Sequence, residues 1–182
     1  MTNIATVNLG LVESDPFAKL MSMDRGIDAV RLERATSDQA ATAYAIVSEY
    51  YEGLRVVARE TREEFRKEYF GPASGVWLAW IGSSLAGCIA LRELRKGDAA
   101  EIKRMYVREA HRGLGIARKL LAEAENFARN RGYQQIFLDS TDEMQAAVRL
   151  YECNGYERCE RYNKNPQATI FMSKNLKEFG PA

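Results

Sequence analysis

A short turn with two glycines, residues 111–117 (HRGLGIA), constrains the fold of this chain more than any other segment. It joins a strand-like segment, Glu101 to Val107, to a segment from about Gly115 to Arg131 with the apolar period of an amphipathic helix. Glycines permit a tight turn and let a ligand approach the backbone N–H groups. A helix start leaves N–H groups unpaired at the positive end of its dipole, so the turn predicts a diphosphate-binding site.

The spacing of the glycines excludes two familiar phosphate-binding motifs. A P-loop needs four residues between its glycines and then Lys-Ser/Thr, which this chain lacks here. A dinucleotide-binding fingerprint needs a third glycine, where Arg118 stands instead. Arg112 and Arg118 add positive charge beside the turn. A nucleotide-binding α/β protein is therefore disfavoured, and a plain glycine-rich turn without a ligand remains the simplest alternative.

Two segments together resemble the GNAT (Gcn5-related N-acetyltransferase) superfamily, and a group of small bacterial members in particular. The strand, the run Arg-Gly-x-Gly-x-Ala and the helix resemble its motif A, and Leu150 to Tyr156 (LYECNGY) resembles its motif B. Finer matches are Gly87 to Arg92, Glu101 to Val107 and Asn165-Pro166, and the resemblance extends over about residues 31–176. It implies an α/β fold with a mixed, mostly antiparallel sheet flanked by helices.

The periodicity of apolar residues predicts the order β-α-α-β-β-β-α-β-α-β-β. The expected strands are 29–33, 76–81, 85–93, 101–107, 135–139, 157–161 and 169–174, and the expected helices run from the Thr36 cap to Leu54 and over 59–69, 115–131 and 143–154. Lys96-Gly97-Asp98 is expected to turn the chain into the strand before motif A. Residues 1–28 are interpreted as an N-terminal extension, 29–176 as one domain, and 177–182 as a tail.

Composition narrows the classes of partner. The net charge of +1 at pH 7 gives no field that favours nucleic acid or an anionic membrane. The longest apolar stretch, Val76 to Leu91, is broken by Gly82-Ser83-Ser84 and predicts a hairpin rather than a membrane span, and no signal-peptide pattern is found. Cys88, Cys153 and Cys159, with a single histidine, lack metal-ligand spacing, so we expect no metal and a cytoplasmic protein with reduced thiols.

The resemblance implies that the chain binds acetyl-CoA as a co-substrate. A backbone N–H of the strand before motif A is expected to hold the thioester carbonyl. The expected contacts are Met105, Tyr106, Val107, Arg112, Gly113, Leu114, Gly115, Ile116, Ala117, Arg118, Thr141 and Ala147. Ala110 and Met144 stand where the superfamily often has Gln or Arg and Asn, respectively, which puts one contact at each position in doubt.

Tyr151 and Glu101 are the candidate catalytic residues. A phenol with a pKa of about 10 stays protonated at neutral pH and can donate to the leaving thiolate, which is the role that the resemblance implies for Tyr151. The resemblance also implies that Glu101 is the base, acting through water; the alternative is a Glu paired with Lys103 or Arg104. Packing is the alternative for Tyr151. His111 is interpreted as a residue at the surface or the phosphate edge.

The acceptor is expected to be a small molecule with a primary amine that enters from the opposite face of the sheet. The residues expected to line its site are Tyr50, Tyr51, Arg55, Tyr162, Asn163 and Asn165. Because Cys88 and Cys153 have no histidine partner in the sequence, direct sequential transfer is expected rather than an acyl-cysteine. The prediction is an acetyl-CoA-dependent N-acetyltransferase; the alternative is a non-catalytic acyl-CoA-binding or regulatory domain. A homodimer is left open, and amines, amino acids, antibiotics and peptides all stay possible as acceptors.

Overall fold

The computed structural model describes residues 30–53, 55–57, 59–95 and 98–177 of the 182-residue chain. The expected extension over residues 1–28, residues 178–182 of the tail, Leu54 and the Lys96-Gly97 part of the expected turn lie outside the described residues.

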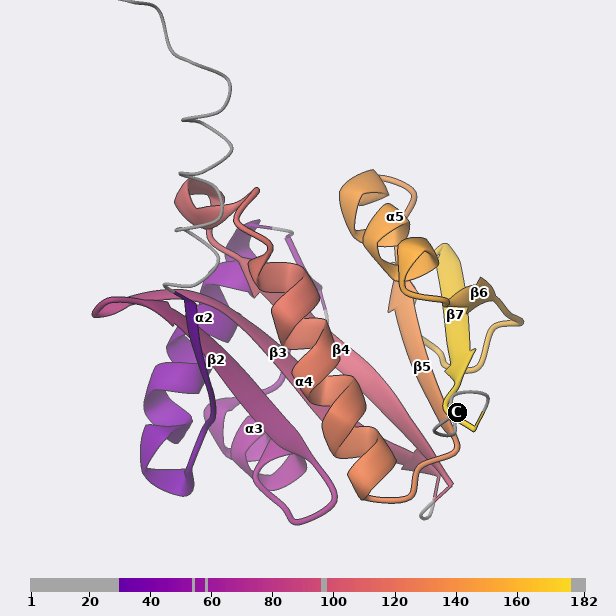
Figure 1. Ribbon diagram of the computed structural model, residues 1–182, viewed down its shortest axis with the longest axis horizontal. Coiled ribbons are helices and arrows are strands. Elements are labelled where there is room, and N and C mark those ends of the chain that lie inside the picture. The colour runs from indigo at the N-terminus through magenta and orange to yellow at the C-terminus, as the bar shows by residue number, and fades with distance from the viewer. Residues whose placement is uncertain (1–29, 54, 58, 96–97, 178–182) are drawn as a thin grey trace, which may run out of the picture.

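One mixed sheet of 7 strands forms the centre of the fold, in the order β1-β2-β3-β4-β5-β7-β6 (Figure 1). The strands are β1 (Val30–Arg34), β2 (Gly75–Ile81), β3 (Ser84–Arg95), β4 (Ala99–Val107), β5 (Gln135–Ser140), β6 (Glu157–Arg158) and β7 (Ile170–Asn175). Only β4 and β5 pair in parallel, and all other neighbours are antiparallel. This confirms the mixed, mostly antiparallel sheet expected from the sequence.

Helices cover both faces of the sheet and bury two separate apolar cores. The helices are α2 (Ala40–Gly53), α3 (Arg62–Tyr69), α4 (Ile116–Asn130) and α5 (Gln145–Cys153), with short 3-10 turns η1 (Ser37–Gln39) and η2 (Glu109–His111). One core joins α4 and α5 to the sheet, and the other joins α2 and α3 to it. The apolar stripe of α4, with Leu120, Leu121 and Ala124 fully buried or nearly so, explains its place across β2, β3 and β4.

Several element boundaries differ from the prediction by a few residues, and two of the differences have a clear structural reason. Helix α3 begins at Arg62 rather than residue 59, because Thr61 caps it: the Glu64 backbone N–H donates to Thr61 Oγ1 at 3.2 Å, and the Thr61 N–H donates to Glu64 Oε2 at 2.8 Å. Strand β6 ends at Arg158 rather than residue 161, since its pairing with β7 covers two residues only.

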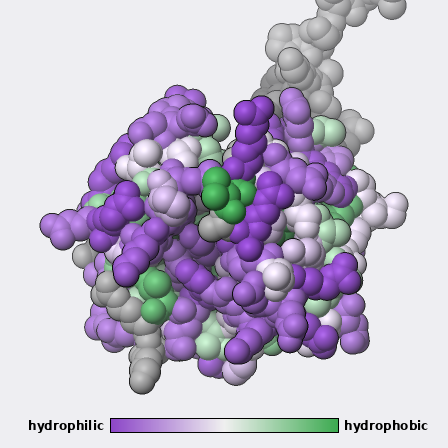
Figure 2. All heavy atoms as spheres, turned by 180° about the vertical axis from the view of Figure 1, so that it is seen from behind, coloured by the Kyte–Doolittle hydropathy of each residue, from purple (hydrophilic) through white to green (hydrophobic). Residues whose placement is uncertain are grey.

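The surface seen from behind is mainly hydrophilic, with apolar residues in small separate patches (Figure 2). Val57 is the large apolar side chain that stands out as exposed among the described residues, at 76%. Within this same part of the chain no helix is long and apolar enough to cross a membrane.

Candidate functional site

The central strands β4 and β5 separate partway along their length, and this opening organises the site. Their parallel pairing runs from Ala99 opposite Gln135 to Ile102 opposite Leu138 and then stops. Beyond Ile102, strand β4 continues alone on this side to Val107 while it remains paired with β3 on the other. The opening passes between the two layers of helices, so a ligand on one face of the sheet can meet a ligand on the other.

A β-bulge in β4 lies at the start of the opening. The register with β3 shifts between Cys88, which faces Tyr106, and Ala90, which faces Lys103, and Arg104 within this interval has a left-handed backbone, φ 55°. An ordinary strand alternates its side chains, so Lys103 and Arg104 would point to opposite faces. The extra residue instead brings both into the same cavity on the α2 and α3 side.

The exposed edge of β4 offers backbone donors to the opening. The Arg108 N–H donates to Ala86 O of β3 at 2.9 Å, so by strand alternation the N–H group of Val107 faces away from β3, while Met105 belongs to the bulge. Met105 and Val107 pack their side chains against the α4 and α5 core, whereas Tyr106 packs on the α2 and α3 side. The Val107 N–H at the edge of the opening can therefore meet a carbonyl oxygen there, and the N–H of Met105 is a second candidate donor.

The glycine turn presents further unpaired N–H groups on the α4 side. Gly113 and Gly115 have φ values of 81° and 72°, and Gly115 is the N-cap of α4. The first backbone hydrogen bond of the helix runs from Lys119 N to Gly115 O, so the N–H groups of residues 116–118 are not used within it. Arg112, Gly113, Gly115 and Arg118 are exposed, while Leu114 and Ala117 are half-buried and Ile116 is anchored in the core. The turn can thus bind an anion as its sequence predicts.

Helix α5 places Tyr151 in the core between α4, α5 and the sheet, outside the residues that line the cavity on the α2 and α3 side. Tyr151 is 5% exposed, and Ala147, one turn earlier, and Thr141, directly after β5, are half-buried. Burial raises the pKa of the Tyr151 phenol, and the negative charge of Asp139 acts in the same direction. No hydrogen bond joins its hydroxyl to another described residue. Tyr151 is therefore a protonated phenol that is free to donate at neutral pH.

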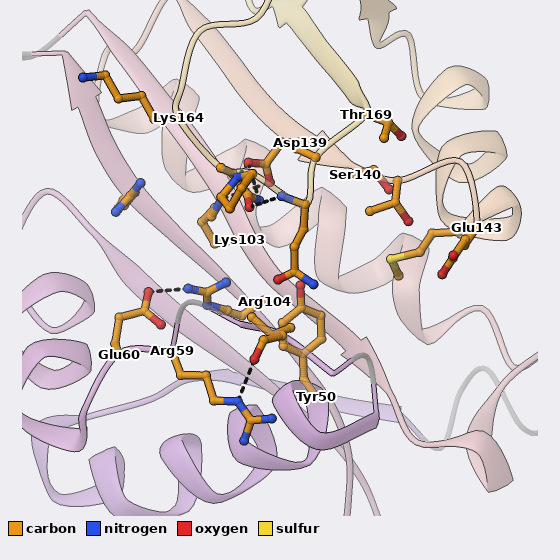
Figure 3. Close-up of a pocket in the computed structure, with 18 of the residues that line it drawn as sticks. Tyr50, Arg59, Glu60, Lys103, Arg104, Asp139, Ser140, Glu143, Lys164 and Thr169 are labelled. Atoms are coloured by element: carbon orange, nitrogen blue, oxygen red, sulfur yellow. Dashed lines mark hydrogen bonds and ion pairs between the residues drawn. The ribbon is translucent and has the colours of Figure 1, made fainter.

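A cavity of about 1070 Å³ lies on the α2 and α3 side of the opening (Figure 3). It is lined by the segment between α2 and α3, by β4 and β5, and by the loop before β7. The lining residues are Tyr50, Val56, Arg59, Glu60, Glu64, Glu68, Arg92, Lys103, Arg104, Asp139, Ser140, Thr141, Asp142, Glu143, Met144, Lys164, Asn165, Pro166, Gln167, Ala168 and Thr169. Its size suits a small molecule.

The residues expected to line the acceptor site divide into three groups. Tyr50 and Asn165 line the cavity. Three others are not part of the lining but hydrogen-bond to carboxylates beside it. Tyr51 donates to Glu60, and Tyr162 and Asn163 donate to Glu101. Arg55 lies outside the lining, and its carbonyl accepts from Gln167 Nε2 at 3.4 Å.

Glu101 is completely buried and its two oxygens are occupied by donors. Arg92 donates to Oε2 from Nε at 2.7 Å and pairs with it from Nη2 at 2.6 Å. Tyr162 at 2.8 Å, Asn163 at 3.1 Å and Lys103 at 3.3 Å donate to Oε1. A carboxylate has about four lone-pair sites, so little accepting capacity is left for a proton from an amine. This arrangement favours the alternative in which Glu101 forms ion pairs over the one in which it acts as the catalytic base.

Asp139 is held in the same way at the end of β5. Lys103 Nζ lies 3.0 Å from Oδ1, and the amides of Asn163 and Asn165 donate to Oδ2 at 2.7 and 3.2 Å. Burial alone would raise the pKa of Asp139, but Lys103 and the two amides outweigh it and hold the pKa below its usual value. Lys103 therefore sits between Glu101 and Asp139 and joins them into one network.

Most of the charged lining of the cavity could not be identified from the sequence alone. Glu60 and Arg59 belong to a segment that was expected to be helical, and Glu60 accepts from Arg104 and Tyr51. The sequence indicates Arg104 only as a possible partner of Glu101, because simple strand alternation would place its side chain on the face of the sheet opposite to that of Lys103. The adjacent charges Lys103 and Arg104 on a strand that enters the core were the one signal in the sequence that could have indicated a bulge.

The sequence of the chain is similar to those of known acetyltransferases. The model of the acetyltransferase (GNAT) family matches residues 40–156. An uncharacterized N-acetyltransferase of Bacillus subtilis (strain 168), YsnE, is 38% identical over 58% of this chain and 72% of its own length. An uncharacterized N-acetyltransferase of Schizosaccharomyces pombe, C1271.07c, is 32% identical over 77% of this chain and 87% of its own.

A solved structure shares the fold. The structure of yncA from Salmonella typhimurium, with its cofactor acetyl-CoA, has a TM-score of 0.65 and 20% identity, and the match covers 85% of this chain and 98% of that chain. At this identity the likeness concerns the fold alone. The family model matches more than half of the chain, and the fold is consistent with that match. The chain therefore belongs to the acetyltransferase (GNAT) family.

Proposed function

We propose that the protein transfers the acetyl group of acetyl-CoA to a primary amine of a small molecule. The observation that carries this proposal is the opening between β4 and β5 beyond Ile102, which connects the glycine turn before α4 with the cavity beside α2 and α3. The solved neighbour that holds acetyl-CoA supports the choice of co-substrate. The free thiols of Cys88, Cys153 and Cys159 support a cytoplasmic location.

In this proposal the start of α4, the edge of β4 and Tyr151 of α5 each have a separate role in the reaction. The N–H groups at the start of α4 bind the diphosphate, and Arg112 and Arg118 add charge. The N–H groups of Met105 and Val107 hold the thioester carbonyl and stabilise the negative charge that grows on its oxygen. Tyr151 donates its proton to the sulfur as the amine nitrogen forms its bond to the carbonyl carbon and the carbon–sulfur bond breaks.

The acceptor ammonium loses one proton to water before it attacks, and its nitrogen loses a second proton as the amide forms, which restores the proton that Tyr151 gave to the sulfur. Neither proton goes to a buried carboxylate. Glu101 and Asp139 are both occupied by cations and amide donors. We infer that they position Lys103, Asn163 and Asn165 and keep the cavity wall in place. A covalent route is disfavoured as well, because Cys88 is buried, burial raises the pKa of its thiol, and the thiol donates to Arg104 O at 3.3 Å.

Replacing Gly113 by Asp tests the binding of acetyl-CoA. Open space surrounds the position of a Cβ at Gly113, so the negative charge enters the turn without a steric clash. We expect the variant to bind acetyl-CoA at least about tenfold more weakly, or about 1.4 kcal/mol, by isothermal titration calorimetry. Gly132 is a matched control at the other end of α4, with φ 83° and open space as well. Gly132→Asp should bind normally, and equal affinity of both variants and the wild type would reject the site.

A coenzyme A release assay tests the transfer itself. The folded protein is given acetyl-CoA and a panel of primary amines, amino acids and short peptides, and the products are identified by mass spectrometry. We expect at least one small amine to be acetylated. Tight binding of acetyl-CoA without acetylation of any acceptor would instead favour a non-catalytic acyl-CoA-binding domain.

A further inference from the structure

The charges around the acceptor cavity are unequally divided between its two ends. Figure 3 shows Lys103 and Asp139 on one side of the cavity, and Glu60, Arg104 and Arg59 on the other. We propose that the acceptor carries a carboxylate as well as its amine, and that Arg104 and Arg59 bind this carboxylate. The inference deepens the proposed function and rests on it.

The backbone of Arg104 is the first observation that supports this proposal. A non-glycine residue at φ 55° lies in a sparsely populated, strained region of backbone conformation, and such residues concentrate at functional sites. The same bulge turns the Arg104 side chain from the α4 face to the cavity. The strained bulge thus places the Arg104 guanidinium in the lining of the cavity, whereas ordinary strand alternation would place it on the opposite face of the sheet.

The guanidinium of Arg104 is fixed but has donor capacity left. It lies over the rings of Tyr51 and Tyr50, at 5.0 and 5.9 Å from their centres, and Nη2 donates to Glu60. Its Nε is enclosed without a partner among the described residues. Nη1 is not enclosed in this way and carries two N–H donors, and the neutral Tyr50 hydroxyl is the one further hydrogen-bond partner of the guanidinium among the described residues. An arginine held in one orientation with a free donor is suited to a carboxylate.

Arg59 provides a second guanidinium beside the first. It lies 5.9 Å from the centre of the same Tyr51 ring, and it donates to the carbonyl oxygens of Val56 at 2.8 Å and Tyr51 at 3.2 Å. No carboxylate among the described residues pairs with it. Glu60, the one carboxylate between the two arginines, already accepts from Arg104 and from the hydroxyls of Tyr51 and Tyr69. This end therefore has two guanidinium groups and one carboxylate.

The opposite end has the reverse balance. Three carboxylates pair there with two cations, Arg92 and Lys103: Glu68 and Asp139 in the lining, and Glu101 buried behind it. This excess of negative charge attracts an ammonium group towards the opening where transfer occurs. The exposed rim carries Glu64, Asp142, Glu143 and Lys164, whose charges water and salt screen. The charge of the exposed Arg59 is screened in the same way, so the less exposed Arg104 is the stronger cation at its end of the cavity. An acceptor with an amine at one end and a carboxylate at the other matches both ends of the cavity.

A matched series of acceptors tests the inference. The amine panel contains free amino acids, the corresponding amino-acid amides and the corresponding decarboxylated amines, so that each set differs only at the carboxylate. We expect kcat/KM for the best amino acid to exceed that for its amide by at least about 30-fold. If an amide or a decarboxylated amine is acetylated equally well, the inference is overturned while the proposed function stands.

Two variants and one control test whether the arginines cause the preference for acceptors that carry a carboxylate. Arg59→Gln is the primary variant, because Arg59 is exposed and its loss should leave the fold intact. Arg104→Gln is the second variant; it removes the partner of the half-buried Glu60, so its fold is checked by circular dichroism. Both should reduce the preference for the carboxylate at least about fivefold, with the amides little changed. Arg62→Gln, which removes an arginine packed over Tyr44 outside the cavity lining, should keep the preference.

A binding measurement separates failure of this inference from failure of the proposed function. Free amino acids and their amides are titrated calorimetrically into the wild-type protein in the presence of coenzyme A. Binding of an amino acid but not of its amide, lost in Arg59→Gln, would support the carboxylate site even if no acetylated product formed. Equal binding of both, or unchanged selectivity in both arginine variants, would overturn it.

Discussion

The Tyr151→Phe variant is expected to turn over at least about 10²-fold more slowly than the wild type, within the range of about 10²–10⁴ that a general acid contributes. The change removes only the hydroxyl, and this hydroxyl has no hydrogen-bond partner among the described residues. Affinity for acetyl-CoA and stability should therefore change little. Because burial raises the pKa of Tyr151, the wild-type phenol should stay protonated across the pH range of the assay.

Tyr156→Phe is the matched control for this measurement. Tyr156 is 2% exposed, and its ring packs against that of Tyr151 with centroids 5.7 Å apart. Its hydroxyl is enclosed in the core, away from the cavity lining. We expect turnover of this variant to stay near the wild-type value. If Tyr151→Phe also turned over normally on a confirmed acceptor, Tyr151 would only pack the core.

The Glu101→Gln variant is expected to lose about 3 kcal/mol of its free energy of unfolding, measured with urea. Removing one partner of a buried ion pair leaves the other without compensation, and here Arg92 and Lys103 both lose their shared carboxylate. The pH dependence of turnover should keep its shape, since in this account Glu101 does not accept the proton of the amine. A flattened rise of activity between about pH 6 and 8 would show instead that Glu101 is the base.

Glu49→Gln is the matched control for stability. Glu49 pairs with Arg108 through two hydrogen bonds of 2.6 and 2.9 Å, but both side chains are more than one third exposed. An ion pair of this kind contributes less than about 1 kcal/mol. Equal loss of stability in the two variants would contradict the network described around Glu101.

The features of the fold that depend on local sequence patterns could be predicted from the sequence. The apolar stripe of α4, the alternation in the hairpin strands and the glycines at residues 113 and 115 are local signals, and the structure has the predicted element order. The start of α3 was misplaced because the capping box at Thr61 and Glu64 decides it, rather than the apolar period.

The environment of the charged site residues could not be predicted in the same way. Glu101 gains donors from Tyr162 and Asn163, which lie 61 and 62 residues further along the chain. The face on which Arg104 lies depends on a bulge, and one extra residue reverses the alternation that a sequence reading assumes. Such contacts arise only when β4, β5 and the loop before β7 meet.

Initial-rate kinetics combined with mass spectrometry test the central claim most directly. With acetyl-CoA and the best acceptor both varied, direct transfer across the opening between β4 and β5 predicts intersecting lines, an acetyl group on the acceptor nitrogen and no acetylated protein. Activity should rise from about pH 6 to 8 as the acceptor amine loses its proton. Parallel lines together with an acetyl group on Cys88 or Cys153 would contradict the account.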